Sequence, residues 1–458
     1  MAYVTVMVYM GRNLAWAEGA AVRTRLTRLT VVGVAVISTL AAGSLASCSS
    51  SSTGSGQSLT WYINPDGGGA DVTKKGQAQI AKECTDAAGG KYSIRVQLLP
   101  NSASDQRQQL LRRLAAGDSG IDLMSIDPVF VAEFAEAGFL APVPPALQAG
   151  FTQDTVKTAV EGARWKGKLV AVPFWANTQL LWYRKSVARK AGLDMTKPVT
   201  WDQVIAAAKS QKKTIGVQAS RYEGYVVWIN ALIAGAGGEV LKNPGATGDA
   251  VKLGLDTKAG QEAAAVIQKV AQTGVGGPAL SSTTETEALN LFSDNATSGF
   301  LVNWPYVWAA LPSNKVKFIK DVGWAKYPET VAGTVSRPPF GGIELGVGAF
   351  SKRPDLAYEA AKCITSTAHQ TLYMIGTGNP AARKSVYDDP AIKKQFPMAG
   401  LIRKSLDEAA QRPQSQYYGD ISTGLQREFS PPDSVNPATT PGAAADLITS
   451  VLKGDTLL

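Results

Sequence analysis

The chain has 458 residues, of which 45% are hydrophobic and 18% charged, with a formal net charge of +9. This length exceeds what one hydrophobic core usually serves, so two or three domains are expected. The basic residues are scattered, which argues against a nucleic-acid-binding surface, and no fixed-period repeat indicates a solenoid or propeller.

The N-terminal region is typical of an export signal. Arg23, Arg25 and Arg28 precede an uncharged run over residues 29–46 and a few small residues. This order predicts a cleavable signal peptide over residues 1–47, and Val22 is our expected true start. An uncleaved anchor helix is the alternative, because the run is at the short edge for a membrane span.

A lipid attachment site is predicted directly after the signal. The run Leu45-Ala46-Ser47-Cys48 matches a bacterial lipobox, which implies that Cys48 becomes the acylated first residue of the mature protein. The Ser/Gly-rich stretch that follows, residues 48–57, is typical of a flexible tether.

The first half of the mature chain alternates strands and helices. Strands are predicted near residues 58–63, 92–100 and 121–127, and helices up to about residue 88, over 105–117 and over 128–143. Gly89-Gly90, Gly117 and Gly138 end the helices, and Ser102 or Ser104 caps the second one. This alternation predicts a parallel sheet with helices on its faces.

The second half predicts another α/β unit. The run "WKGKLVAVPFWANTQLLWYRKSV" indicates two strands joined through Pro173. Helices are predicted over residues 200–209, 223–237 and 260–274, a strand returns at residues 341–351, and the last 80 residues are helical with proline-rich breaks. Two α/β units and a return strand predict two domains joined by more than one crossover.

Several kinds of catalysis are disfavoured. His369 is the single histidine and lies far from any G-x-S-x-G, which argues against a catalytic Ser-His or Cys-His pair. The sequence has no H-E-x-x-H, no C-x-x-C and no phosphate-binding loop, so we predict no metal site, no cofactor and no nucleotide hydrolysis.

Polar residues at predicted loop junctions are the candidate ligand contacts. Asp127 ends a buried strand, where parallel sheets face their ligand crevice, and a carboxylate there can accept hydroxyl hydrogen bonds. Asn177 follows the "VPFWAN" turn, and Arg383 follows "GTGNPA". The structural alternatives are a helix cap for Asp127 and a solvated helix start for Arg383.

The run "FLVNWPYVWAAL" at residues 300–311 concentrates aromatic rings. "FLV" predicts a buried strand and "VWAAL" the helix after it, so Asn303-Trp304-Pro305 is the junction. We therefore expect Trp304 to stack on a ligand, Tyr306 to assist it and Trp308 to pack inside. Isolated aromatic residues are usually core residues, which is the alternative for each.

Two cysteines remain after Cys48 is assigned, Cys84 and Cys363. Outside the cytoplasm a disulfide between them is favoured, and free buried cysteines are the alternative.

The chain resembles the sugar-binding proteins of ABC transporters, the class of the maltose-binding protein. Seven stretches carry the resemblance in the family's order: "GIDLMSIDPVFVAEFAEAGFLAPV", "WKGKLVAVPFWANTQLLWYRKSV", "TWDQVIAAAK", "EGYVVWINALIAGAGGEVL", "FLVNWPYVWAAL", "GGIELGVGAFS" and "GTGNPAARKSVYDDP". Within that class it is most similar to the trehalose-binding lipoproteins of mycobacteria and related actinobacteria, on "NTQLLWYR", "NWP" and both cysteines.

The resemblance places sugar contacts at Asp127, Asn177, Trp304 and Arg383. It also implies a glutamate before residue 300, for which Glu285 is preferred to Glu287. Further candidates are Glu223 and the loop from Asn64 to Asp66, in "INPDGGG", which differs in residue type from its relatives.

The resemblance implies a two-domain, type II periplasmic-binding-protein-like α/β fold with a hinged cleft. Residues 58–175 and 341–376 would form the first domain, and residues 176–340 and 377–458 the second. A monomeric receptor, held on the outer face of the cell membrane by its lipid, would capture a disaccharide, expected to be trehalose. It would deliver the sugar to a permease driven by a separate ATPase.

Two alternatives remain open. One is a receptor of the same fold for maltose, a longer glucan or a glycerophosphodiester. The other is a secreted glycoside hydrolase, in which Asp127 and Glu285 would act as the carboxylate pair.

Overall fold

The structure is a computed structural model that describes residues 57–65 and 68–458. The predicted signal peptide, Cys48, the tether up to residue 56 and Asp66 lie outside the described residues. Among the described helices, none is both long enough and apolar enough to cross a membrane.

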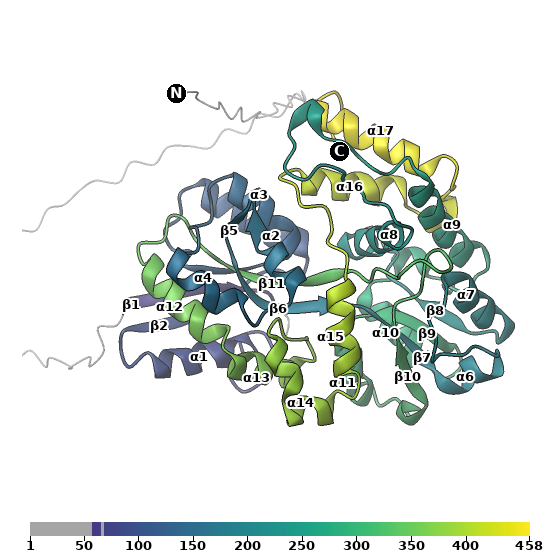
Figure 1. Ribbon diagram of the computed structural model, residues 1–458, viewed down its shortest axis with the longest axis horizontal. Coiled ribbons are helices and arrows are strands. Elements are labelled where there is room, and N and C mark those ends of the chain that lie inside the picture. The colour runs from purple at the N-terminus through teal and green to yellow at the C-terminus, as the bar shows by residue number, and fades with distance from the viewer. Residues whose placement is uncertain (1–56, 66–67) are drawn as a thin grey trace, which may run out of the picture. The chain divides into compact units, whose positions relative to one another are not determined.

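Two mixed sheets form the framework of the described chain (Figure 1). The first has the strand order β2-β1-β3-β11-β6. Its strands are β1 (Gln57–Ile63), β2 (Tyr92–Leu98), β3 (Leu123–Ile126), β6 (Val172–Thr178) and β11 (Phe340–Val347). The second has the order β10-β7-β9-β8, formed by β7 (Leu180–Arg184), β8 (Thr214–Gly216), β9 (Ser298–Asn303) and β10 (Val322–Ala325).

Helices flank both sheets. Those around the first sheet are α1 (Gln77–Ala87), α2 (Ala103–Ala115), η1 (Pro128–Phe130), α3 (Val131–Glu136), α4 (Pro145–Thr152), α5 (Lys157–Gly162), α12 (Pro354–Ile364) and α13 (Thr367–Thr377). Those around the second are α6 (Lys185–Lys190), α7 (Trp201–Ser210), α8 (Glu223–Gly235), α9 (Lys258–Gln272), α10 (Glu285–Ser293) and α11 (Tyr306–Ser313).

The C-terminal segment adds α14 (Pro390–Gln395), α15 (Ala399–Glu408), α16 (Tyr418–Glu428) and α17 (Thr440–Lys453). Short 3-10 turns and the hairpin of β4 (Arg164–Trp165) and β5 (Lys168–Leu169) complete the described fold. The 3-10 turns after η1 are η2 (Gly248–Ala250), η3 (Leu280–Ser282), η4 (Ile319–Asp321), η5 (Lys384–Asp388) and η6 (Pro432–Ser434).

Local sequence signals explain many element boundaries. Ser102, one of the two predicted caps, accepts a hydrogen bond from the Asp105 backbone and begins α2. Thr200 and Gln203 form a reciprocal capping box that begins α7. Gly117 and Gly138 follow their helices with φ of 71° and 72°, a backbone that side-chain-bearing residues rarely adopt.

The prediction that Pro173 joins two strands is wrong. Pro173 lies inside β6, and the second strand, β7, begins only at Leu180. β6 is the edge strand of the first sheet, and its register against β11 shifts between Ile343 and Glu344, opposite this proline. An edge position beside a bulge tolerates proline, because fewer backbone donors are needed there.

The chain passes between the two sheets more than once. β6 continues into β7 through Gln179, and β11 returns to the first sheet after β10 has completed the second. Figure 1 shows β6 pointing from the first sheet towards the second. β6 also runs across the predicted domain boundary at residues 175–176, so the boundaries themselves stay predictions.

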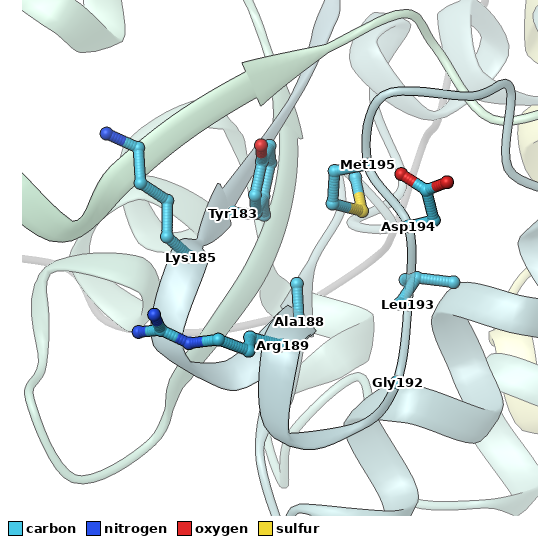
Figure 2. A pocket seen from close by; sticks show the side chains of 8 residues that line it. All are labelled: Tyr183, Lys185, Ala188, Arg189, Gly192, Leu193, Asp194 and Met195. Carbon is cyan, nitrogen blue, oxygen red and sulfur yellow. The ribbon is translucent and has the colours of Figure 1, made fainter.

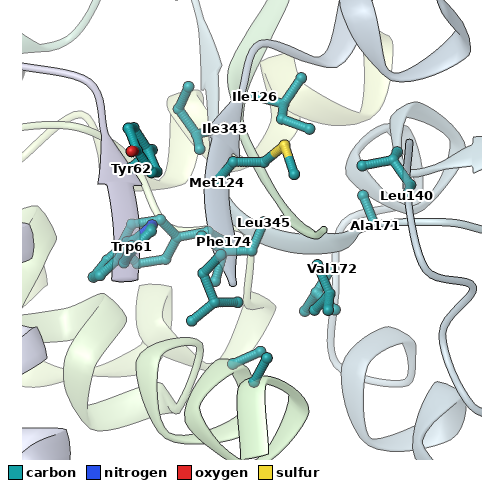
Figure 3. Packing of buried hydrophobic residues seen from close by; sticks show 14 of the residues in the cluster. Trp61, Tyr62, Met124, Ile126, Leu140, Ala171, Val172, Phe174, Ile343 and Leu345 are labelled. Atoms are coloured by element: carbon teal, nitrogen blue, oxygen red, sulfur yellow. The ribbon is translucent and has the colours of Figure 1, made fainter. Parts of the chain in front are cut away.

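Three clusters of buried hydrophobic residues pack against the sheets, and the third contains residues of both, such as Phe340 and Trp182. In the first sheet, Trp61, Phe174 and Leu345 from three different strands lie on one face, Met124 of β3 lies on the other, and all four are fully buried (Figure 3). Trp228 is likewise fully buried in the second cluster, so these aromatic residues are core residues.

The structure contains the disulfide that the cysteine count favours. Cys84 of α1 and Cys363 of α12 are bonded, with 5.9 Å between their Cα atoms. Both helices pack beside the first sheet, although 279 residues separate the two cysteines.

Candidate sugar-binding site

Three predicted polar residues lie at one edge of the first sheet. β1, β3 and β6 run parallel to one another, because β11 is antiparallel to both β3 and β6. Asn64, Asp127 and Asn177 therefore stand at or just after the carboxyl ends of these strands. This is the edge at which open α/β sheets bind ligands.

Asp127 is both a cap and a partner in a buried ion pair. Its Oδ1 accepts the Val129 backbone N–H at 3.3 Å, as the capping alternative predicts. The same oxygen accepts Nη2 of Arg412 at 2.7 Å, and the Arg412 side chain is only 3% exposed. The capping prediction is therefore confirmed, and a ligand contact of Asp127 stays a prediction.

Arg412 joins Asp127 to Glu223, the first residue of α8 beside the second sheet. Its Nη1 donates to Glu223 Oε1 at 2.6 Å. Tyr418 also donates to Oε1, and Ser422 donates to Oε2 at 2.7 Å. Glu223 is thus held by three donors from the C-terminal segment.

Burial and charge act against each other in this cluster. Burial raises the pKa of Glu223 above its ordinary value, although the Arg412 charge acts in the opposite direction. Burial disfavours the charged form of Arg412, yet the Asp127 carboxylate holds the pKa of Arg412 above its usual range. Burial likewise raises the pKa of Tyr418, which remains a neutral hydrogen-bond donor.

Trp304 lies over the first sheet although it directly follows β9 of the second. A Cβ built on Gly341 of β11 would lie 3.1 Å from Cη2 of Trp304 and 3.8 Å from Cβ of Asn177. Gly341 is also paired with Asn177 across β11 and β6. A glycine here lets the indole ring approach the strand backbone beside Asn177.

Glu285 is the next predicted residue, and it begins α10. Its Oε2 accepts the Tyr222 hydroxyl at 2.6 Å, while its backbone carbonyl accepts the Asn303 amide at 3.0 Å and the Tyr306 hydroxyl at 3.2 Å. The Trp304 backbone N–H in turn donates to Asn303 Oδ1 at 2.8 Å. The start of α10 and the aromatic junction are therefore fixed together.

The structure separates the roles of the two candidate glutamates. The Glu287 carboxylate accepts both the backbone N–H and the hydroxyl of Thr284, which closes a capping box. The Thr284 hydroxyl lowers the pKa of Glu287. The Glu287 carboxylate thus caps the N-terminus of α10, whereas the Glu285 carboxylate accepts the Tyr222 hydroxyl.

Tyr222 and Glu223 are consecutive and connect the two groups of residues. The Tyr222 hydroxyl binds Glu285, and the Glu223 carboxylate binds Arg412. A Cβ on Gly224 would lie 2.1 Å from the Tyr222 hydroxyl oxygen, so the missing side chain makes room for that ring. Burial, followed by the Glu285 charge, raises the pKa of Tyr222.

Arg383 is not brought together with these residues. Its Nε donates to the Thr365 carbonyl at 2.7 Å and its Nη2 to the Gly150 carbonyl at 3.0 Å. The turn that precedes it does approach the site, because the Ala176 N–H donates to the Pro380 carbonyl at 3.1 Å. The guanidinium between the candidate carboxylates belongs to Arg412, and a ligand role for Arg383 stays a prediction.

The side chain of Asn64 is buried and is fixed by a hydrogen bond from Gln77. Gln77 Nε2 donates to the Asn64 side-chain oxygen at 2.9 Å, and Gln77 itself accepts the Ser125 hydroxyl.

Trp308 packs against buried residues, as a structural role predicts, but it is less buried than expected. It is half-buried on α11, packs edge-on against Trp324 and donates Nε1 to the Gln395 carbonyl at 3.0 Å.

Sequence reasoning missed Arg412, Tyr222 and Gly341. Arg412 stands in the proline-containing stretch "QRPQSQYYGD", where neither periodicity nor a motif marks it. Tyr222 precedes a candidate, Glu223, but long-range contact decides where its hydroxyl points. Gly341 opens the "GGIELGVGAFS" strand, and a glycine in a strand is the one available signal of close approach.

Two surface pockets of the described chain lie away from this group of candidate contacts. One of about 410 Å³ is formed by β7, α6 and the loop after it, with Tyr183, Arg189 and Met195 in its wall (Figure 2). The other, of about 360 Å³, includes Phe151 and Arg383. Apart from Arg383, neither contains a predicted contact, so pocket size alone does not identify the site.

One group among the described residues has the composition of a metal site. Cys84, Cys363 and His369 bring three potential ligand atoms within 4.8 Å of one another. The two sulfurs are bonded to each other, so they do not offer the thiolates that zinc binds.

The arrangement as a whole suits a polyhydroxylated neutral ligand. Carboxylates and amides at the strand ends accept and donate hydrogen bonds, and an indole ring offers an apolar face.

Comparison with known proteins gives the family. Residues 67–371, more than half of the chain, match the model of the bacterial extracellular solute-binding proteins. A "Probable ABC transporter-binding protein" of Deinococcus radiodurans is 25% identical over 368 residues, which are 78% of this chain and 83% of that protein.

Solved structures share the fold. Maltose-bound MalE3 of T. maritima is 25% identical, with a TM-score of 0.72 over 87% of this chain and 99% of that one. A Thermotoga lettingae ABC-transporter solute-binding protein, bound with α-D-tagatose, is 22% identical, with a TM-score of 0.73 over 86% of this chain and 100% of that one. The predicted two-domain periplasmic-binding-protein-like fold is confirmed.

The family and the fold are those of ABC-transporter receptors rather than of enzymes, and the chain belongs to the bacterial extracellular solute-binding protein family.

Proposed function

We propose that this protein captures a disaccharide of the trehalose type between its two sheets and delivers it to an ABC importer. One observation carries the proposal: Trp304, presented by the second sheet, lies over Gly341 and beside Asn177 of the first. A ring that covers the backbone of the opposite sheet offers a stacking face at the junction between the two domains.

Polar groups around this ring match the needs of a sugar. Asp127 and Asn177 come from the first sheet, and Glu285 comes from α10 beside the second. Carboxylates accept two hydroxyl hydrogen bonds each, and charge strengthens them. Glu223, Asn64, Asp66 and Tyr306 are proposed as further contacts, and Arg412 joins them on the strength of its two ion pairs.

Closure of the two domains on the sugar would complete the site. Asp127 follows β3 of the first sheet and Glu223 begins α8 beside the second, and Arg412 bonds to both carboxylates. These two contacts lie where we expect the domains to close on each other. We propose further that Cys48 carries a lipid and that the closed, sugar-loaded monomer docks on a permease served by a separate ATPase.

A thermal-shift screen tests the ligand class. The mature protein is heated with trehalose, maltose, maltotriose, mannitol and glycerophosphocholine, and hits are measured by titration calorimetry. We expect the largest stabilisation from trehalose, because a ligand that binds the folded state alone raises the melting temperature. If none of the disaccharides stabilises the protein, the substrate class is wrong.

The maltose alternative has a specific observation in its favour, because the T. maritima relative is maltose-bound. A larger shift with maltose than with trehalose would establish it. The hydrolase alternative predicts glucose release during prolonged incubation with either disaccharide, whereas a receptor returns the sugar unchanged.

A further inference from the structure

One buried carboxyl group beside the candidate site has no role in the contacts described so far. Glu344 lies on β11, its side chain is fully buried, and neither of its oxygens has a hydrogen-bond partner among the described residues. Buried polar groups are normally satisfied, so an exception of this kind asks for a functional explanation.

Glu344 stands next to Asp127 in the sheet. It is paired with Ile126 across β11 and β3, and Ile126 is the residue before Asp127. Its Oε1 lies 3.4 Å from the Cβ position of Gly162, and Cβ of Pro128, the residue after Asp127, lies 3.3 Å from the same point. The two carboxyl groups therefore belong to one small region.

Within the part of the chain that the structure describes, Glu344 has no ion pair with a cation. Burial first, and then the negative charge of Asp127, raise the pKa of Glu344 well above its ordinary value. Opposite it on β6 is Pro173, which has no N–H to donate. Arg412 donates its two terminal nitrogens to Glu223 and Asp127, and no hydrogen bond between Arg412 and Glu344 is present among the described residues.

The other elements packed against β11 do not supply a charge either. β3 and β6 contain no titratable residue, and Lys157 and Glu161 of α5 pair with each other at the surface. In α12 the Tyr358 hydroxyl donates to the Ala141 carbonyl, and its charged residues are all exposed: Asp355, Glu359 and Lys362.

We propose that Glu344 is a positioning residue for Asp127: held as a neutral acid, it lets Asp127 keep its pairing with Arg412, and its ionisation weakens sugar capture. This inference rests on the proposed function. A second negative charge beside Asp127 repels that carboxylate and pushes it away from its place beside Arg412. This movement displaces a charged acceptor from the sugar site.

The first test needs no ligand. Infrared spectra of the mature protein at neutral pH are recorded for the wild type and for Glu344→Gln. The wild type should show the carbonyl band of a protonated carboxylic acid that the variant lacks. Identical spectra would overturn the proposal. If the variant does not fold, loss of the band during an alkaline titration of the wild type alone supports it, and a wild-type spectrum without the band overturns it.

The second test measures affinity for trehalose and for maltose by calorimetry from about pH 5 to about pH 9. The wild-type Kd should rise with pH, by at most about tenfold per pH unit for one proton. Glu344→Gln should show no such rise, because an amide does not ionise. Glu239→Gln, at an exposed glutamate, is the matched control and should keep the wild-type profile.

The outcomes separate this proposal from the proposed function. Parallel pH profiles for wild type and Glu344→Gln would overturn the positioning role even if both bind sugar. If neither sugar binds the wild type at any pH, the proposed substrate fails. In that case the stability of the two ligand-free proteins tests the positioning role. As pH rises above the ordinary carboxyl pKa, the wild type should lose stability relative to Glu344→Gln. Equal stability of the two proteins over this pH range would overturn the proposal.

Discussion

Arg412 holds together the charges of the candidate site. Its side chain is 3% exposed, and its two terminal nitrogens bind Asp127, which follows β3 of the first sheet, and Glu223, which begins α8 beside the second. Removing one partner of a buried ion pair is costly, because the remaining charge is left in a poorly solvated environment.

Replacing Arg412 by methionine should destabilise the protein by about 3–5 kcal/mol at neutral pH. Without the guanidinium, the pKa of Glu223 rises further in the folded state than its burial already raises it. A folded pKa above the unfolded value means that stability is greatest below the unfolded pKa and is lost as pH rises through the folded one. Urea unfolding of the variant should therefore show recovery at acidic pH.

Arg427→Met is the control for that measurement. Arg427 pairs with Glu428 at 3.8 Å and its side chain is 49% exposed, so its loss should change stability by less than about 1 kcal/mol. An Arg412 variant no less stable than this control would contradict a structural role for the buried pair.

The approach of Trp304 to Gly341 gives a second residue-scale prediction. Gly341→Ala places a Cβ 3.1 Å from the indole and must displace the ring by a few tenths of an ångström. We expect weaker binding of the selected disaccharide, measured by calorimetry, with a smaller change in melting temperature. Unchanged affinity would show that the ring does not contact the sugar.

At the scale of elements, local sequence signals set most boundaries. The cap at Thr200 and the glycines after α2 and α3 act within a few residues, so the sequence predicts them. Pro173 was misjudged because whether a proline fits a strand depends on its neighbour in the sheet, which only the order β11-β6 reveals.

The first turn of α10 allows the two glutamates to be separated by experiment. Glu287→Ala removes the capping box and should lower stability by about 1 kcal/mol while sugar affinity is kept. Glu285→Gln leaves the cap in place but removes the charge that faces Tyr222, so affinity should fall. Paired thermal unfolding and calorimetry check both, and the reverse pattern would favour Glu287 as the contact.

At the scale of the whole molecule, distant segments are brought into one sheet. β11 returns between β3 and β6 after the second sheet has been completed, and the disulfide joins α1 to α12 across 279 residues. A bond between residues so far apart restricts the unfolded chain strongly in the loop-entropy description.

Replacing both Cys84 and Cys363 by serine should therefore lower the free energy of unfolding by about 2–5 kcal/mol. Denaturation of the mature protein with and without a reducing agent provides the check: the wild type should lose stability on reduction and the double variant should not. Equal stability of both proteins under oxidising conditions would contradict this expectation.

The sequence by itself determined the alternation of strands and helices, the two-domain class and the strand-end positions of Asp127 and Asn177. Periodicity, caps and glycines act locally, and the order of short stretches indicates the family. It could not determine that Arg412 rather than Arg383 meets Asp127, that Glu287 caps a helix, or that Glu344 is buried with no hydrogen-bond partner among the described residues. Those facts depend on which segments far apart in the chain become neighbours, and only the tertiary structure decided them.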